Sequence, residues 1–216
     1  MSTVLDHLVV AAPTLAEGAA WCQAMLGVEA GPGGEHALMG THNRLLNISG
    51  APFAASYLEI IAINPAAPAP GRARWYGLDT LDLSGGPRLI HVVAGSTMLD
   101  MHRWGLITVG CQPGEPVRVS RDTPAGRLEW EILVREDGQL SHGGALPTLI
   151  QWHGPHPTDR MPASGVVLRS LTLRGVGPRP REVLRLRGVN FSDEAGPAIT
   201  AVLDTPRGAV TLQTTT

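Results

Sequence analysis

Two short phrases of nearly the same sequence constrain the fold of this chain more than any other feature. Residues 6–10 (DHLVV) and 90–94 (IHVVA) each place one histidine in an apolar run typical of a buried strand. His91 follows His7 by 84 residues (91 − 7), and a helix-start signal follows each phrase. A small unit built twice would bring its two histidines toward each other. The repeat therefore predicts a duplicated domain with a shared central site.

The order of expected elements is the same in both units. In the first, a strand over 5–12 precedes a helix that a capping box at Thr14 and Glu17 opens and Gly27 ends, followed by one or two strands in 36–48 and a strand over 56–63. In the second, the expected elements are a strand over 88–94, a helix from 97 to about 105, a hairpin of 117–121 and 128–134 around a turn at 122–126, and a strand over 146–152. Each unit reads β-α-β-β-β.

A third, weaker copy follows. Its strand over 166–173 has Ser170 where the other two have histidine, and a short helix (181–187) and a hairpin (198–203 and 209–213) come after it. We predict a first module over 1–64, a connection over 65–86, a second module over 87–157, and a partial βαββ module over 158–216 packed on the same domain.

Composition excludes several classes of protein. With 43% hydrophobic and 17% charged residues among 216, the chain is typical of a globular protein. A net charge of −2 and arginines interrupted by acidic residues argue against nucleic-acid binding. There is no apolar run of about 18 residues, which argues against a membrane span. Two cysteines without motif spacing suggest a reducing compartment. We expect a cytoplasmic protein with a small-molecule ligand, and a homodimer stays open.

Four polar residues on the expected strands could form one site: His7, Glu59, His91 and Gln151. A carboxylate buried in the run Leu-Glu-Ile-Ile is costly unless it is paired, protonated or bound to a metal. A divalent cation would relieve that cost and use both imidazoles. This mixed nitrogen and oxygen set suits Zn, Fe, Mn, Ni or Co without selecting among them. The alternative is that each histidine is a hydrogen-bonded core residue. No glycine-rich phosphate loop is present, so no nucleotide cofactor is expected.

Several phrases carry a family resemblance: residues 5–9 (LDHLV), 40–46 (GTHNRLL), 57–61 (YLEII), 74–78 (RWYGL) and 147–152 (PTLIQW). Together with the duplicated β-α-β-β-β order, they resemble the vicinal oxygen chelate superfamily, and more narrowly its glyoxalase-like domain family of bacterial proteins. The resemblance runs from about residue 4 to 162. It implies an α+β fold in which paired βαβββ modules curl their sheets into a cup.

In that superfamily a metal sits in the cup, bound by the first and last strands of each module. The resemblance therefore implicates His7, Glu59, His91 and Gln151 as ligands. Gln151 departs from the pattern, because a carboxylate usually stands there. Glu129 and Glu131 on the neighbouring hairpin are candidate substitutes.

The leading functional hypothesis is a glyoxalase-like enzyme of the lyase, isomerase or dioxygenase type. A divalent metal would chelate substrate oxygens and stabilise an enolate or alkoxide, with Glu59 as ligand or as a catalytic proton shuttle. The competing hypothesis is a metal-free binding protein of the bleomycin-resistance kind. A structural or interaction module is a third.

Other polar and aromatic side chains have two interpretations each. His36, His42 and Asn43 either line the substrate cup or serve a turn. Arg74 either grips a substrate carboxylate or packs in the connection. Trp152 is a candidate for substrate binding. The tract 152–157 (WHGPHP) could bind a metal, although its prolines favour an exit loop.

Overall fold

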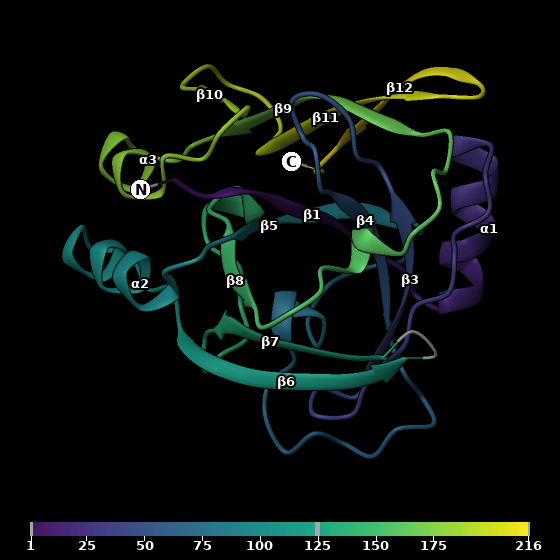
Figure 1. Ribbon diagram of the computed structural model, residues 1–216, viewed down its shortest axis with the longest axis horizontal. Coiled ribbons are helices and arrows are strands. Elements are labelled where there is room, and N and C mark those ends of the chain that lie inside the picture. Colours follow the sequence, from purple (N-terminus) through teal and green to yellow (C-terminus); the bar gives the residue numbers. More distant parts are fainter. Residues whose placement is uncertain (1, 124–125, 216) are drawn as a thin grey trace.

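The computed structural model describes residues 2–123 and 126–215 and has the expected α+β architecture (Figure 1). The first module contains β1 (Val4–Ala11), α1 (Leu15–Leu26), β2 (Glu35–His36), β3 (Thr41–Asn47) and β4 (Tyr57–Ile63). The second contains β5 (Arg88–Gly95), α2 (Leu99–Thr108), β6 (Glu115–Thr123), β7 (Gly126–Val134) and β8 (Thr148–Trp152). The C-terminal segment contains β9 (Val167–Arg174), α3 (Pro178–Leu184), β10 (Asn190–Ser192), β11 (Ile199–Thr205) and β12 (Gly208–Gln213).

The strands of both modules form one eight-stranded sheet in the order β2-β3-β4-β1-β5-β8-β7-β6. In each module the first strand pairs in parallel with the fourth, and the modules join where β1 runs antiparallel to β5. The sheet curls until β6 and β7 lie across the cup from β1 and β5 (Figure 1). The predicted duplication and cup are confirmed.

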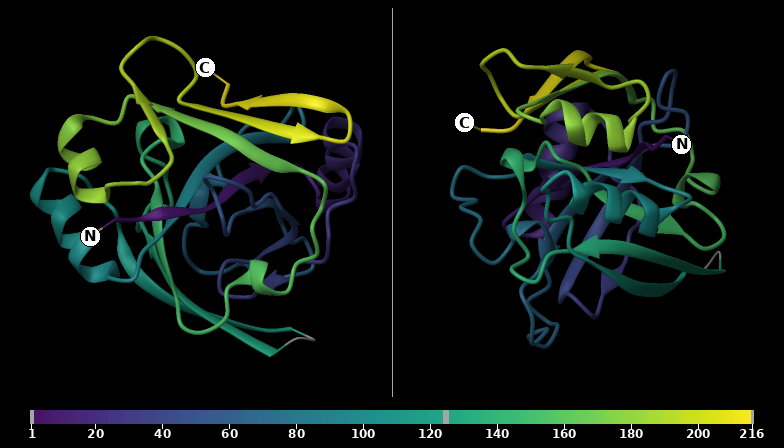
Figure 2. Two further views of the ribbon diagram at one scale, coloured as in Figure 1. Left: turned by 45° about the horizontal axis from the view of Figure 1, so that its top comes forward. Right: turned by 90° about the vertical axis from the view of Figure 1, so that its left-hand side faces the viewer.

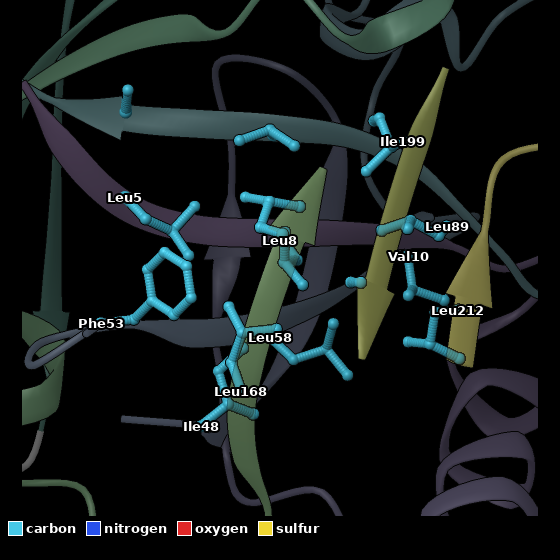
Figure 3. Packing of buried hydrophobic residues seen from close by; sticks show 14 of the residues in the cluster. Leu5, Leu8, Val10, Ile48, Phe53, Leu58, Leu89, Leu168, Ile199 and Leu212 are labelled. Carbon is cyan, nitrogen blue, oxygen red and sulfur yellow. The ribbon is translucent and has the colours of Figure 1, made fainter. Parts of the chain in front are cut away.

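Apolar side chains occupy both faces of this sheet, as expected for strands whose sequences are almost continuously apolar. One buried cluster fills the inside of the cup and includes Val9, Val93 and Ile132. A larger cluster covers the outer face, where the two helices and the C-terminal strands pack on β1, β4 and β5. Figure 3 shows Leu8 and Leu58 of the large sheet meeting Leu168 of β9 in this layer.

The C-terminal segment forms a second sheet, in the order β10-β9-β11-β12, over the outer face (Figure 2). Its topology is not that of a module, because β9 pairs antiparallel with β11 and in parallel with the short β10. The helix expected over 181–187 begins earlier, at Pro178, since proline is well suited to the first turn. Of the predicted turn at 122–126, residues 124–125 lie outside the described ones.

The start and end of α1 follow from its sequence. The Thr14 hydroxyl accepts a hydrogen bond from the Glu17 backbone N–H at 3.1 Å. Gly27 ends the helix in the left-handed conformation that glycine favours. Within the described ranges, no helix is both long and apolar enough to cross a membrane.

Candidate functional site

A β-bulge in β1 turns two consecutive side chains into the cup. Neighbouring residues of a regular strand point to opposite faces, but the pairing of β1 with β5 shifts by one between Leu5 and His7. Asp6 is therefore the extra residue of a bulge, a device that redirects side chains. Asp6 and His7 are both buried, and the Asp6 Oδ1 atom lies 2.7 Å from His7 Nδ1.

The segment after β8 holds the second oxygen of Asp6. The Trp152 indole N–H donates to Asp6 Oδ2 at 2.9 Å, and His156 Nε2 lies 3.2 Å from the same atom. The prolines of the tract 152–157 return the chain over the cup, so that this exit loop closes on the bulge. With both oxygens engaged, the Asp6 carboxylate fixes the orientation of the His7 ring.

Glu59 reaches the opposite edge of the same ring. Parallel pairing of β1 with β4 sets Glu59 beside Val9, on the face that carries His7. Its Oε2 atom lies 3.5 Å from His7 Nε2, and Asn43 donates to its Oε1 atom at 2.6 Å. His7 Nε2 is buried and has no hydrogen-bond partner within the described part of the chain. This nitrogen is therefore available to a ligand.

The two carboxylates keep the imidazole of His7 protonated. Burial would lower the pKa of His7, but the hydrogen bond to Asp6 and the nearby Glu59 outweigh burial and raise it from 6.5 to about 9. Burial would raise the pKa of Asp6, yet His156 and His7 hold it well below its usual range. The pKa of Glu59 is also lowered, because His7 outweighs the cost of burial. The result is a buried carboxylate–imidazolium–carboxylate arrangement.

Asn43 and His36 form the polar wall next to Glu59. The Asn43 Oδ1 atom accepts from the Gly34 backbone N–H at 2.8 Å and from Arg121 Nη1 at 3.2 Å, which directs the Asn43 amide nitrogen to Glu59. His36 Nδ1 lies 3.0 Å from the Thr41 hydroxyl, and burial lowers the pKa of His36 to about 4. His36 is therefore neutral where His7 is charged.

Aromatic rings complete the cavity around His7 and Glu59. The ring of Tyr57 stacks on His7, with 4.5 Å between ring centroids. The other aromatic wall residues are Trp75, Tyr76, Trp130 and Trp152. The free volume among them is about 30 Å³, room for one water or the end of a small group.

His91 faces the inside of the cup but does not converge with His7 and Glu59. Its Nδ1 atom donates to the Gly144 carbonyl at 2.7 Å, and its Nε2 atom accepts from the Thr148 hydroxyl at 2.9 Å. Burial lowers the pKa of His91 to about 3, which keeps the ring neutral. Since both nitrogens are bonded within the fold, the predicted meeting of His91 with the other two side chains does not occur.

The prediction that Gln151 joins the site is wrong. Its side chain lies on the outer face of β8 and accepts the Leu99 backbone N–H at the start of α2, at 3.0 Å. Strand register gives the reason: Val9 pairs with Glu59, and Val93, the equivalent of Val9, pairs with Thr148. Thr148 is therefore the counterpart of Glu59, and it contacts His91 as Glu59 contacts His7.

Three other groups considered from the sequence lie away from the cavity. His42 alternates with Asn43 along β3 and is on the outer face. Arg74 pairs with Asp79 at 2.6 Å and stabilises the connection between modules. Glu129 and Glu131 lie on the face of β7 opposite Trp130, where Glu131 pairs with His153 at 3.3 Å.

The side chains present do not fit the four-residue metal site that was expected. His7 and Glu59 could both touch one ion, and a carboxylate on the far nitrogen is usual behind a histidine ligand. However, transition-metal sites generally draw three or four ligands from the protein. Among the described residues there is no group of three or more His, Cys, Asp or Glu side chains that could hold a metal.

Asp6 and Arg121 were not identified as site residues from the sequence. Asp6 stands directly before His7, and a two-residue period assigns neighbours to opposite faces, so only the bulge brings them together. Arg121 is far from His7 in sequence, and its place depends on how far the sheet curls. The acidic residue within an apolar strand was the available signal for Asp6, since a buried carboxylate requires a partner.

The curled βαβββ cup with a histidine–carboxylate pair inside defines the class of protein. A family model described as "Glyoxalase-like domain" matches residues 5–186. The chain belongs to this family, which confirms the resemblance seen in the sequence.

Solved structures share the fold at low sequence identity. A hypothetical protein from Staphylococcus aureus is 12% identical with a TM-score of 0.61, over 98% of this chain and 86% of that one. A variant of Streptomyces coelicolor methylmalonyl-CoA epimerase in complex with 2-nitronate-propionyl-CoA is 16% identical with a TM-score of 0.44, over 70% and 97%. The Mycobacterium tuberculosis methylmalonyl-CoA epimerase is 18% identical with a TM-score of 0.40, over 70% and 88%. No curated protein matches the sequence significantly.

Proposed function

We propose that this protein is a small-molecule enzyme that moves a proton to or from a carbon atom next to a carbonyl group. The supporting observation is the buried His7 Nε2 atom, which is 3.5 Å from the Glu59 carboxylate and has no hydrogen-bond partner in the described residues. An ionised carboxylate beside a protonated imidazole provides a base and an acid in one small space.

Each group has one step in the proposed reaction. Glu59 takes the proton from the carbon, and the electron pair of the broken C–H bond moves toward the carbonyl oxygen. The Nε2–H group of His7 donates a hydrogen bond to the resulting enolate oxygen, held in place beforehand by Asp6. Return of the proton from Glu59 to carbon gives back the carbonyl, with isomerisation or hydrogen exchange as the outcome.

This mechanism assigns to the His7 imidazolium the role first expected of a divalent metal. The predicted ligand set lacks two members, because both nitrogens of His91 are bonded and Gln151 lies outside the cup. No step therefore passes through a metal ion.

The test is hydrogen exchange in D₂O, followed by proton NMR on 2-oxobutanoate, 4-phenyl-2-oxobutanoate and 4-phenyl-2-butanone. Protein of measured metal content, dialysed against a chelator, should exchange the hydrogens beside the carbonyl of at least one compound. Glu59→Gln and His7→Gln should each slow the exchange about 100-fold or more. His42→Gln, on the outer face of the same sheet, should match the parent protein.

Two results would overturn the proposal. Exchange that appears only after a divalent metal is added would return the enolate-stabilising role to the metal. Binding of the compounds without exchange above that of buffer would favour the metal-free binding protein instead. The five aromatic residues around the cavity favour this second candidate function, since aromatic walls suit capture of an apolar ligand.

A further inference from the structure

A second hollow leads into the site from outside. Leu45, Arg121, Leu128, Pro157, Arg160 and Met161 are among its walls, and its volume is about 290 Å³. We call it the vestibule. It shares Leu45, Arg121 and Pro157 with the inner cavity around His7. Because the inner cavity holds little more than a water, the body of any substrate has to lie in the vestibule.

The vestibule combines apolar walls with an excess of positive charge. Three arginines line it, and no aspartate or glutamate is among its described lining residues. Arg127 is already paired with Glu129 at 2.9 Å. Arg160 has neither a hydrogen bond nor an ion pair from its guanidinium to any described residue. An unpaired arginine beside apolar surface is a ready site for an anion.

Arg121 lies where the vestibule meets the inner cavity. Its Nη1 atom donates to Asn43 at 3.2 Å, and its Nε atom is buried without a partner among the described residues. Gly34 makes room for this position, since a Cβ atom there would lie 2.5 Å from Arg121 Cδ. The Arg121 guanidinium is thus one side chain, Asn43, away from Glu59.

We propose, on the basis of the function proposed above, that the substrate is an oxo acid with an apolar body. Its carboxylate binds Arg121, its carbonyl group enters the inner cavity beside His7, and its apolar body lies against Leu128 and Met161. Asp6, His7, Glu59 and Arg121 together are close to neutral, so Arg160 at the rim supplies the positive charge that balances the incoming carboxylate.

Two unreactive probes separate binding from chemistry: 4-phenylbutanoate and its neutral counterpart 4-phenylbutanamide. Calorimetric titration of the full chain should give an affinity about tenfold or more higher for the acid, the usual magnitude for a charge-assisted hydrogen bond. Arg121→Gln should remove this preference, and Arg160→Gln should reduce it. Arg118→Gln is the matched control, because Arg118 is on the same strand but is exposed on the opposite face.

The outcomes distinguish this inference from the proposed reaction. Equal affinity for acid and amide, or an acid preference that survives in a folded Arg121→Gln variant, would overturn the oxo-acid assignment even if hydrogen exchange occurs. A preference that depends on Arg121, also present in Glu59→Gln, would support the assignment even if the exchange assay fails. Melting curves of each variant verify that it is folded.

Discussion

At the scale of single residues, His7 and His91 show how differently two imidazoles in one cup can be used. His7 lies between two carboxylates and keeps one nitrogen facing the cavity. His91 has both nitrogens bonded to the chain that contains Gly144 and Thr148. The first ring is therefore available for chemistry, whereas the second fixes the loop before β8.

The raised pKa of His7 predicts a pH-dependent stability. A histidine whose folded-state pKa is above its unfolded value stabilises the fold fully below pH 6.5, and this contribution is lost as the pH rises through about 9. The free energy of unfolding should fall by up to about 3 kcal/mol over that window. Urea titrations at several pH values measure the fall, and NMR of the imidazole protons follows His7 itself.

Asp6→Asn provides the control for this pH dependence. The amide can still accept a hydrogen bond from His7 but carries no charge, so the pKa of His7 should move back toward 6.5. The decline in stability should then begin at lower pH and be smaller. An unchanged titration of His7 in this variant would contradict the role given to Asp6.

Thr148→Val separates the two modules by function. His91 Nε2 would lose the hydroxyl but keep the Thr148 backbone N–H, now at 3.2 Å. We expect a loss of stability of about 1 kcal/mol, typical of one hydrogen bond, and unchanged hydrogen exchange of the carbonyl compounds. Slower exchange in a folded Thr148→Val variant would mean that His91 acts in the reaction.

At the scale of elements, the sequence predicted the strands and helices well, because their apolar periodicity and caps are local signals. The register between strands is set by long-range pairing, which explains why Gln151 was assigned to the cup. A one-residue change of register moves a side chain to the other face. The bulge at Asp6 is a similar feature, since it is visible only in the pairing of β1 with β5.

The packing of α1 against β4 gives a prediction at this scale. A Cβ atom at Gly18 would lie 2.4 Å from Ile60 Cγ2, so the helix approaches the sheet too closely for any side chain there. Gly18→Ala should destabilise the protein by about 1–3 kcal/mol through overpacking, although alanine favours helices.

Ala24→Gly is the matched control, because Ala24 is exposed on the same helix. It should cost about 1 kcal/mol through helix propensity alone. Adding a methyl group at one position and removing one at the other should thus both destabilise. Thermal or urea unfolding of the two variants tests this, and a stabilised Gly18→Ala protein would contradict the close packing.

At the scale of the whole molecule, the C-terminal sheet acts as part of the core that supports the cup. Leu171 of β9 and Leu8 of β1 belong to one buried cluster, and neither is exposed. The strand that carries His7 and Asp6 therefore has the site on one face and the C-terminal sheet on the other. A partial copy without a histidine could be predicted from the sequence, but its place over β1 could not, because it depends on contacts between distant segments.

This arrangement predicts one cooperative unfolding transition for the whole chain. All five tryptophans precede residue 158, so tryptophan fluorescence reports on the two modules alone. Leu171→Ala removes a buried side chain from the C-terminal sheet and should destabilise by about 2–5 kcal/mol. If both sheets share one core, the fluorescence midpoint in urea should shift by the full amount. Thr211→Ala, exposed on β12, should leave the midpoint almost unchanged. A shift seen by circular dichroism but absent from fluorescence would show that the C-terminal sheet unfolds independently of the cup.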